Sequence, residues 1–505
     1  MTQKKPSLPQ GTRDFSAEVV RKRNYIFSTI RNVFEKYGFE PLETPAMENL
    51  DTLMGKYGEE GDKLIYRILD SGNPFNKAFL KAFGEFLHHH NLAHKAFSKA
   101  QNLNEPSPYE QPFWKIPIEL LVPLLKKMLD EKEEYAKYLP QFKNPIAGKA
   151  LKYDLTIPFA RYVAMNHTKL IFPLRRYQIQ PVWRADRPQK GRYREFTQCD
   201  ADVVGSLSLI TEVELANIYH EVFIQLGIKN YELRINSRKI LTALAELCGG
   251  ADKMIDISIA IDKLDKVGLE KVKEELLERG IKNKQVEIIE NYLLISGTNE
   301  QKLAQVKALI GNIETGKQGI AELEFVDQHT KNCNLVIDFT LARGLNYYTG
   351  VIFEAKAPEE VKMGSIGGGG RYDDLTGLFG VPGIPGVGIS FGVDRIYDVL
   401  EEMNLFPEDL QVSTKALFFN MGEEESLFAF DIMQKLRSSG TACELYHEPV
   451  KINKQFSYAE KKNIPFAIII GNKEMEQMYC LVKNLSTGIQ EVVPLERLNT
   501  YMKEL

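Results

Sequence analysis

The stretch WRADRPQKGRYREFTQCDADVVG, Trp183–Gly205, decides the fold, because it predicts two strands joined by a basic loop. PQKG within it has the composition of a turn. Alternate residues of a strand share one face, so Arg192, Arg194 and Phe196 are expected to point the same way. Guanidinium groups bind phosphate oxygens in two-point fashion and an aromatic ring can stack on a base, which makes this hairpin a candidate nucleotide site. A solvated basic hairpin is the alternative.

Strands and helices are expected before and after this hairpin. Apolar residues at helical spacing predict one long helix over Ser16–Tyr37, which Gly38 ends. FEPLETPAM at Phe39–Met47 follows as a strand that Pro45 limits to an edge or an end. Strand-like and helical stretches alternate from Lys152 to Arg234.

Three further segments differ in character from this core. Ser71–Lys149 is rich in proline and predicts a pair of helices with an irregular connection. Asn236–Asn334 is mostly helical and rich in Lys and Glu, which indicates a separate helical module, and strand character returns at Asn334–Phe339 and Val351–Ala355. From about Val412 strand and helix alternate, which predicts a small α/β domain.

The bulk composition sets the class of protein. The 505 residues suggest about three or four domains, and 44% apolar with 26% charged residues is typical of a globular chain. The formal net charge of −4 gives no global sign of a nucleic-acid partner, although a local basic groove can lie on an acidic protein. Five separated cysteines without a CxxC pair argue against a zinc ribbon or disulfide framework and favour the cytoplasm. The N-terminal stretch is no signal peptide, and apolar runs such as Phe466–Ile470 are too short to span a membrane.

Two glycine-rich stretches are further candidates for ligand contact. SIGGGGRYDDL at Ser365–Leu375 has four consecutive glycines, which permit positive φ and a close approach of the backbone to a ligand. Arg371 after them suggests an anion or nucleotide site, and an ordinary hairpin is the alternative. GIPGVGISFGVDRIYDVL at Gly383–Leu400 predicts an apolar strand that runs into a helix, with Arg395 in the helix's first turn. Its glycines allow either tight packing or room for a flat ligand.

LARGLNYYTG at Leu341–Gly350 places an arginine, Arg343, just past an apolar strand. A buried unpaired arginine is strongly unfavourable, so a phosphate or carboxylate is expected beside it. A salt-bridged arginine with two core tyrosines is the alternative.

KYDLTIPFARYVAMN, Lys152–Asn166, carries two polar residues that could hold an ammonium group. Asp154 and Thr156 are expected on one face of a strand that ends before Pro158. Equally, Asp154 could cap the helix that follows.

The histidine run His88–His90, with His94, suggests metal binding only weakly. Consecutive residues on a helix point in different directions, and no carboxylate partner stands out. A surface position is favoured, and no metal site formed by protein residues is predicted.

These segments, in this order, resemble the class II aminoacyl-tRNA synthetases, and within them the histidine family. The long N-terminal helix with FEPLETP resembles motif 1, Trp183–Phe196 resembles motif 2, and Gly386–Arg395 resembles motif 3. LARGLNYYTG and SIGGGGRYDDL match the two signatures that separate the histidine family from the proline, threonine and glycine families. The resemblance covers nearly the whole chain outside Ser71–Lys149. Two departures are Asn346, where the family usually has Asp, and Ala342, which replaces a larger apolar residue.

The resemblance implies an α+β multidomain fold: the antiparallel sheet core of class II synthetases, helical insertions and a C-terminal α/β anticodon-binding domain. Residues 1–70, 150–235 and 335–410 would form the catalytic core. Residues 236–334 would be a helical insertion domain near the acceptor stem, and residues 412–505 the anticodon-binding domain. The helical insert 71–149 would pack on the catalytic domain or its dimer mate, with a tRNA contact as the second possibility.

The resemblance also implies a reaction. ATP and L-histidine would give histidyl-adenylate and pyrophosphate, and the histidyl group would then move to the 3′ end of tRNA(His). Magnesium is expected on the pyrophosphate end, and motif 1 implies a homodimer.

Roles follow from the resemblance residue by residue. Arg184 and Arg343 would contact the α-phosphate and the histidine carboxylate, with Arg343 serving where other class II enzymes place a metal. Phe196 and Arg395 would sandwich the adenine, and Arg192 would complete the ATP site. The remaining assignments are the ammonium ligands Asp154, Thr156 and Gln198, the imidazole ligands Asp202, Tyr347 and Tyr348, and the acceptor-stem contact Gln189.

Two rival functions are open to such a sequence. A synthetase-like regulatory subunit of histidine biosynthesis would share the core, but such proteins lack the C-terminal domain and usually lose active-site arginines. A synthetase for another amino acid is the second rival. The chain keeps Arg184, Arg343 and Arg395 and has a long segment after Val412, which disfavours the regulatory subunit.

Arg343→Ala is expected to cut ATP–pyrophosphate exchange by at least a hundredfold without affecting folding. Removing one preorganised charge contact costs about 3–4 kcal/mol of transition-state stabilisation. Near-normal exchange in a folded Arg343→Ala protein would remove Arg343 from the reaction.

Overall fold

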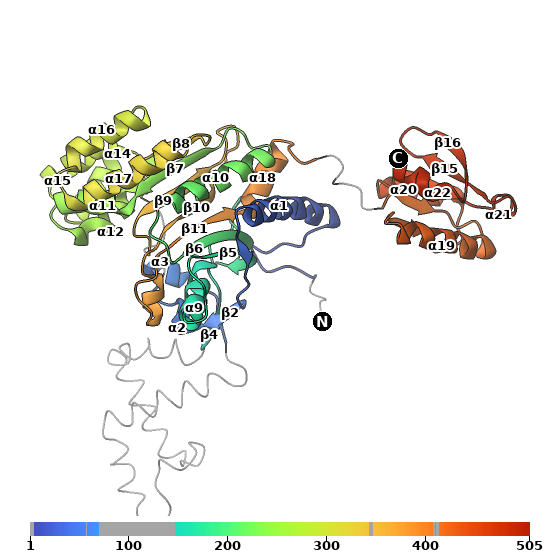
Figure 1. Ribbon diagram of the computed structural model, residues 1–505, viewed down its shortest axis with the longest axis horizontal. Coiled ribbons are helices and arrows are strands. Elements are labelled where there is room, and N and C mark those ends of the chain that lie inside the picture. Colours follow the sequence, from blue (N-terminus) through green and yellow to red (C-terminus); the bar gives the residue numbers. More distant parts are fainter. Residues whose placement is uncertain (1–4, 57, 70–146, 343–346, 408–409, 411–413) are drawn as a thin grey trace, which may run out of the picture. The chain divides into compact units, whose positions relative to one another are not determined.

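The computed structural model describes residues 5–56, 58–69, 147–342, 347–407, 410 and 414–505 (Figure 1). The chain divides into two compact units. The first comprises Met1–Asp14 and Ile26–Leu405, and the second comprises Phe15–Tyr25 and Phe406–Leu505. The predicted pair of helices in Ser71–Lys149 falls almost entirely outside the described residues.

The first unit is built on a large sheet with antiparallel pairing through its centre. Its described strands follow the order β1-β5-β6-β11-β10-β9-β7-β8, and only the edge pairs β1–β5 and β7–β8 are parallel. The strands are β1 (Glu40–Pro41), β5 (Leu174–Trp183), β6 (Glu195–Val204), β7 (Glu232–Ser237), β8 (Leu335–Ile337), β9 (Val351–Lys356), β10 (Ser365–Arg371) and β11 (Gly386–Gly392). The expected antiparallel sheet core is confirmed.

The hairpin β5–β6 contains the two longest strands of this sheet. Its ten-residue strands pair from Leu174 opposite Val204 to Trp183 opposite Glu195. A tight turn closes the loop between them, where Gln189 and Arg192 exchange backbone hydrogen bonds of 2.9 and 3.1 Å. The prediction of two strands joined by a basic loop is confirmed.

Helices cover one face of the sheet. The helix predicted for Ser16–Tyr37 is present as α1 (Ala17–Lys36), and α10 (Ile210–Gln225) and α18 (Val393–Glu402) complete the layer. Phe391 of β11 lies at the centre of this packing: its ring centroid is 5.9 Å from that of Phe34 and 4.7 Å from that of Tyr219. The opposite face of β6, β10 and β11 is left for the cavity described below.

A small sheet and a helix adjoin the other face. The sheet has the order β2-β4-β3, and its elements and neighbours are β2 (Met47–Asn49), α2 (Leu50–Leu53), α3 (Gly58–Lys63), β3 (Arg67–Ile68), β4 (Lys149–Leu151) and α9 (Thr156–Asn166). The single strand predicted for Phe39–Met47 is therefore wrong, because β1 covers only Glu40–Pro41 and β2 begins at Met47. Pro45 in the gap has no N–H to donate to a ladder.

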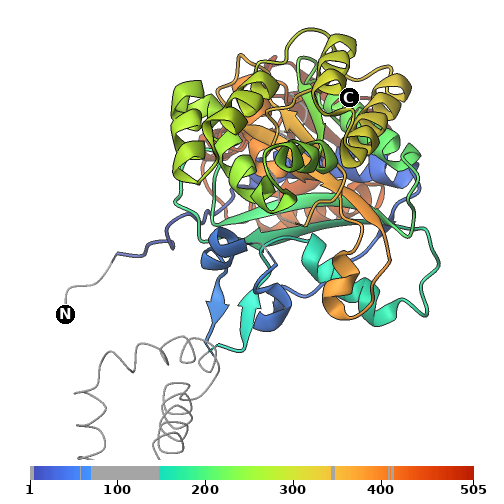
Figure 2. The same ribbon diagram turned by 90° about the vertical axis from the view of Figure 1, so that its left-hand side faces the viewer.

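The segment predicted to be mostly helical, Asn236–Asn334, is confirmed as a group of helices. They lie together beside the β7–β8 edge of the sheet in Figure 1 and form the yellow-green group in Figure 2. They are α11 (Arg238–Leu247), α12 (Met254–Ile261), α13 (Leu264–Val267), α14 (Leu269–Glu278), α15 (Asn283–Leu293), α16 (Asn299–Ile310) and α17 (Glu314–His329). Buried Ile240, Leu244, Ile289 and Leu323 are part of their apolar interior.

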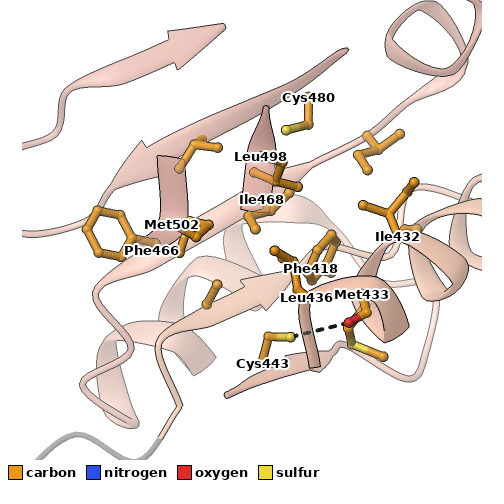
Figure 3. Close-up of a cluster of buried hydrophobic side chains, with 14 of the residues drawn as sticks. Phe418, Ile432, Met433, Leu436, Cys443, Phe466, Ile468, Cys480, Leu498 and Met502 are labelled. Atoms are coloured by element: carbon orange, nitrogen blue, oxygen red, sulfur yellow. Dashed lines mark hydrogen bonds between the residues drawn. The ribbon is translucent and has the colours of Figure 1, made fainter. Parts of the chain in front are cut away.

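The second unit contains the predicted small α/β arrangement. Its sheet has the order β13-β12-β14-β15-β16, parallel through β14 and antiparallel beyond it. The elements are β12 (Ala416–Phe418), α19 (Glu423–Ser438), β13 (Cys443–Leu445), α20 (Ile452–Lys461), β14 (Phe466–Ile469), α21 (Asn472–Glu476), β15 (Tyr479–Asn484), β16 (Gln490–Pro494) and α22 (Leu498–Glu504). Figure 3 shows its core, in which Phe418 and Ile468 from the sheet meet Met433 and Leu436 from α19.

The described helices include none with the length and apolarity needed to cross a membrane.

A buried ion pair ties the sheet to α10. Arg371, at the end of β10, places Nη2 2.8 Å from Oε2 of Glu212, and both side chains are almost inaccessible to solvent. The same guanidinium donates to the carbonyl of Ser206 and to Asp373. The prediction that Arg371 contributes to an anion or nucleotide site is therefore wrong, because the protein itself supplies the anion.

Arg371→Met is expected to destabilise the first unit. It leaves the Glu212 carboxylate buried without its partner, and breaking such pairs costs about 3–5 kcal/mol. The midpoint of thermal unfolding should fall, and the double variant Arg371→Met/Glu212→Leu should recover most of the loss. Lys36→Ala is the control, because Lys36 pairs with Glu221 while 66% exposed. A wild-type midpoint in Arg371→Met would show that the pair does not stabilise the unit.

Candidate active site

A cavity of about 420 Å³ lies on the uncovered face of the central strands. The hairpin loop, β6, β10, β11 and the start of α18 all contribute to its wall. It brings together six residues singled out in the sequence: Arg184, Arg192, Phe196, Gln198, Tyr348 and Arg395.

Several glycines of β10 and β11 lie where neighbouring side chains occupy the space that a Cβ would need. A Cβ at Gly388 would lie 2.0 Å from Oδ1 of Asp202, and one at Gly370 would lie 2.9 Å from the Tyr348 ring. On the opposite face, a Cβ at Gly367 would lie 2.7 Å from the Tyr219 ring. The four consecutive glycines lie in strand β10 in the middle of the sheet, without positive φ, and three of them, Gly367, Gly368 and Gly369, line the cavity.

Arg184 is fixed at one wall of the cavity by aromatic rings. Its guanidinium carbon lies 4.3 Å from the ring centroid of Tyr153 and 5.2 Å from that of Phe196. Its Nε donates to the carbonyl of Tyr153 at 3.0 Å. Tyr153 was not predicted, although it adjoins the predicted Asp154.

Arg395 is held on the same side by backbone carbonyls. It lies in the first turn of α18, as predicted, and donates from Nε to Gly191 at 2.7 Å and from Nη1 to Ser365 at 2.5 Å. These bonds fix the guanidinium beside the cavity that Phe196 also lines.

Arg194 does not share the face of its neighbours, which corrects the prediction for Arg192, Arg194 and Phe196. Strand β6 begins only at Glu195, so residues before it do not follow strand alternation. Arg192 and Phe196 line the cavity, whereas Arg194 donates to the carbonyls of Asp186 and Gln10, at 3.1 and 3.3 Å.

The N-terminal segment also braces the hairpin. Arg13 stacks 3.3 Å from the ring centroid of Tyr193 and forms an ion pair with Asp394. Asp394 in turn accepts from the backbone N–H of Thr197 at 3.2 Å. No pattern in the sequence indicated this contact between segments far apart in the chain.

A group of buried carboxylates adjoins Ser390 and Tyr348, which line the cavity. Asp154, Asp200 and Asp202 are each 2% exposed. Burial raises the pKa of Asp200 to about 7. Burial also raises the pKa of Asp202, and the nearby Arg176 guanidinium offsets part of that rise. Asp200 and Arg176 were not predicted.

Asp202 is held on two sides. The hydroxyl of Tyr372 donates to Oδ1, and the Arg176 guanidinium lies 2.8 Å from Oδ2. Burial and the adjacent Asp202 raise the pKa of Tyr372, so this hydroxyl stays a donor. Tyr372 lies two residues after the last glycine of the predicted run, yet only the structure shows its contact.

Asp154 precedes a helix and does not belong to a strand. Thr156 is the first residue of α9 and Pro158 the third, so the predicted strand ending before Pro158 is wrong. Proline is tolerated in a first helical turn, where its missing N–H has no partner in the helix. Asp154 Oδ1 accepts from the N–H of Ile157 at 3.1 Å, which confirms the alternative that it caps this helix.

The paired tyrosines approach these carboxylates. Tyr347 donates from its hydroxyl to Oδ2 of Asp154 at 3.2 Å, and its ring centroid lies 5.0 Å from that of Tyr348. Tyr348 lines the cavity, and burial raises its pKa.

The two predicted glutamines lie in different environments. Gln198 donates from Nε2 to Oγ of Ser390 at 2.8 Å, while its Oε1 is buried without a hydrogen-bond partner. Gln189 lies at the exposed tip of the hairpin turn.

Some predicted residues lie outside the described residues, namely Arg343, Asn346, His88–His90 and His94. In the part of the chain that the structure describes, no group of three or more His, Cys, Asp or Glu is arranged to hold a metal ion.

The site therefore has two chemically different ends. Guanidinium groups and aromatic rings at one end suit a phosphorylated, flat ligand. Buried carboxylates, an amide oxygen without a partner and two tyrosines at the other end suit a small ligand with several N–H donors.

Comparisons with known proteins give a family. The family described as Histidyl-tRNA synthetase matches residues 117–396, and the family described as Anticodon binding domain matches residues 415–505. A protein of Flavobacterium johnsoniae named histidine–tRNA ligase is 49% identical over 500 residues, 98% of each chain. One of the same name from Bacteroides fragilis is 47% identical over 498 residues, again 98% of each chain.

A solved structure agrees with these relatives. The histidyl-tRNA synthetase from Nostoc sp. PCC 7120 matches with a TM-score of 0.73 and 29% identity, over 99% of this chain and 100% of that chain. The family match spans more than half of the residues and the relatives are similar along their whole length, so the chain belongs to the histidyl-tRNA synthetase family.

Proposed function

We propose that this chain ligates L-histidine to tRNA(His) in an ATP-dependent reaction, through a histidyl-adenylate, as a class II aminoacyl-tRNA synthetase. The observation that carries the proposal is a cavity lined by fixed arginines, with a group of buried carboxylates behind its lining residues Ser390 and Tyr348. Relatives named histidine–tRNA ligase that match along 98% of this chain support it and disfavour the regulatory-subunit alternative.

ATP would occupy the basic and aromatic end. Phe196 and Arg395 would hold the adenine between a ring and a cation, which favours a flat heterocycle over a sugar or lipid. Arg184 and Arg192 would take phosphate oxygens. Since Arg184 is already held by the Tyr153 carbonyl, little side-chain freedom is lost when ATP binds.

Histidine would occupy the acidic end. Its ammonium group needs acceptors, and Asp154, Thr156 and the unpartnered Oε1 of Gln198 would supply them. Asp202 and Tyr348, with Tyr347 nearby, would bind the imidazole. Such a site rejects apolar amino acids, because its buried polar groups would be left without partners.

The first step would join these two ligands. A carboxylate oxygen of histidine attacks the α-phosphorus of ATP, the bond to the β-phosphate breaks, and pyrophosphate leaves. Negative charge builds up on oxygens around that phosphorus, so Arg184 and Arg343 would lower the repulsion and stabilise the transition state.

Magnesium would accompany the phosphates. The cavity wall offers the carboxylates of Asp186 and Glu354, which suits an ion usually held by one or two carboxylates together with phosphate oxygens. When bound, Mg²⁺ neutralises charge on the departing pyrophosphate.

In the second step the 3′-terminal ribose hydroxyl of the tRNA would attack the activated carbonyl carbon and release AMP. Gln189, at the exposed hairpin tip, would contact the end of the acceptor stem. Residues 412–505 would bind the anticodon, which the family match over 415–505 supports. Residues 1–70, 150–235 and 335–410 would form the catalytic core, 236–334 would lie near the acceptor stem, and 71–149 would pack on the core or the dimer mate.

The oligomeric state and the cellular location of the protein are further parts of this proposal. We infer a homodimer through the motif 1 region, from the resemblance alone. A cytoplasmic location fits five cysteines that are all free thiols, since a reducing compartment keeps them so.

ATP–pyrophosphate exchange with each of the twenty amino acids is expected to respond to histidine alone. Exchange requires adenylate formation but no tRNA, so it isolates the first step. No response to histidine from well-folded protein would overturn the proposal, and a response to a different amino acid would favour the second rival.

Gly388→Ala is expected to raise KM for histidine at least about tenfold and to change KM for ATP much less. The added methyl would displace the Asp202 carboxylate, and hydrogen bonds to charged groups contribute about 1.5–3 kcal/mol. Gly364→Ala is the matched control, because its Cβ would meet only Nη1 of Arg395 at an ordinary 3.8 Å. Equal effects of the two variants on KM for histidine would argue against Asp202 as the imidazole ligand.

A further inference from the structure

Arg176 is a fully buried arginine in the middle of β5, directly opposite Asp202 in the β5–β6 register. Its side chain is only 1% exposed, and Nη2 lies 2.8 Å from Oδ2 of Asp202. Arg176 is not among the residues that line the cavity, and its guanidinium is occupied by groups of the protein itself.

Three further contacts fix this guanidinium in place. Nη1 donates to Oε1 of Gln178 at 3.2 Å, and Nη2 donates to the carbonyl of Leu155 at 3.4 Å. The guanidinium carbon lies 4.2 Å from the ring centroid of Phe159. A cation held from four sides at a buried position is costly for folding, and well-packed apolar residues often replace buried pairs without loss of stability.

The charges around Asp202 explain what the cation does. The groups that face Asp202 from the packed elements are Arg176 from β5, Asp200 from β6, Asp154 before α9, Tyr348 before β9 and Tyr372 after β10, while β11 contributes only Gly388. Three carboxylates therefore lie near one guanidinium. Like charges and burial both favour neutral carboxyl groups, and Arg176 opposes them.

Lys152 is a second buried cation, but it does not replace Arg176 as the partner of Asp202. It donates to Oε1 of Gln180 and, at 3.1 Å, to the carbonyl of Thr44. Burial lowers its pKa to about 8, so its charge is already weakened near neutral pH.

We propose that Arg176 is a positioning residue for Asp202, which keeps this carboxylate ionised and in one orientation so that it accepts an N–H of the substrate's imidazole. The inference rests on the proposed function and deepens it. Arg176 and the Tyr372 hydroxyl occupy opposite oxygens of Asp202, which leaves the carboxylate's remaining lone pairs in fixed directions.

The sign of the pH effect follows from these contacts. Arg176 lowers the pKa of Asp202 and of Asp200, against a rise caused by burial. Without Arg176 both values rise further, so Asp202 becomes neutral as the pH falls through its new pKa. A neutral carboxyl is a weaker acceptor, and histidine binding should weaken most at acidic pH.

The test compares the wild type with Arg176→Leu, Arg176→Gln and Arg176→Lys between about pH 6 and pH 8.5, where histidine and Asp200 titrate. KM for histidine, KM for ATP and kcat are measured by pyrophosphate exchange. Histidine's own titration cancels when each variant's KM is divided by that of the wild type. Arg175→Leu is the matched control: the adjacent residue pairs with Glu214 at 2.7 Å, on the other face of the same strand.

The two neutral variants, Arg176→Leu and Arg176→Gln, are expected to raise KM for histidine at least about tenfold at neutral pH, because a charged contact is lost. The ratio of their KM to that of the wild type should grow as the pH falls. KM for ATP should stay within about twofold, because none of the groups that Arg176 contacts is a proposed ATP ligand. Arg176→Lys restores a charge but not the planar fork, so it should raise KM for histidine about three- to tenfold with no new pH dependence. Arg175→Leu should leave KM for histidine unchanged at every pH.

A folded neutral variant whose KM ratio is small and independent of pH would overturn the proposal. If Arg176→Leu fails to fold, Arg176→Gln decides, and a wild-type KM in Arg176→Lys would by itself overturn the orienting role. An equal increase of KM for histidine in Arg175→Leu would show that the loss of any ion pair on β5 has this effect, which would overturn the specific role of Arg176. Loss of the proposed function is distinguishable, because then the wild-type protein itself would show no histidine-dependent exchange.

Discussion

The register between β5 and β6 is the constraint on which the site depends. Arg176 opposes Asp202, and Gln178 opposes Asp200, so one face of this pair presents charged and amide groups. The other face presents Tyr177, which packs on Phe34 of α1. Because side chains alternate along a strand, a slip of one residue would move Asp200 and Asp202 against the apolar helices. The packing of α1 and α10 therefore also determines which groups reach the cavity.

Keeping several carboxylates on one sheet face is energetically unfavourable unless cations and donors surround them. Two buried arginines each neutralise a buried carboxylate, one on either face of the sheet. Arg371 pairs with Glu212 on the helix-covered side and joins β10 to α10. Arg176 lies beneath the site and neutralises charge at a place where a ligand would also act. The glycines of β10 and β11 complete the arrangement, since Tyr348 and Asp202 can lie flat only above positions without a Cβ.

The sequence predicted the elements better than it predicted the contacts. The basic hairpin, the long N-terminal helix, the strand–helix junction before Arg395 and the α/β order of the last segment are all present, because each follows from local periodicity and turn residues. Asp154 was placed on a strand because the short stretch before Pro158 has no periodicity that separates strand from helix start. The glycine run was predicted as a candidate for ligand contact, with a hairpin as the alternative, because glycine composition alone does not reveal a central strand whose neighbours fill the space above and below it.

Residues that act across strands gave no local signal. Arg176 lies in an ordinary alternating strand, and its importance follows only from the residue opposite it, twenty-six positions further along the chain. Tyr153, Tyr372, Asp200 and Arg13 are similar, since each is defined by a partner distant in sequence. Arg194 shows the converse: strand alternation predicted the direction of its side chain, but strand β6 begins only at Glu195.

The glycines of β10 and β11 have a consequence for inhibitors. A compound that stacks on β10 and β11 would rest on backbone rather than on side chains. Resistance commonly arises when a side chain under a bound drug is exchanged for a larger one. At Gly370 and Gly388 that route is closed, because any larger residue would push aside Tyr348 or Asp202 before it disturbed the drug. Gly368 and Gly392, which line the cavity, differ, since a Cβ there would approach only backbone atoms at 3.4 Å or more. Escape from such a compound would therefore come from these two positions or from the walls of the cavity.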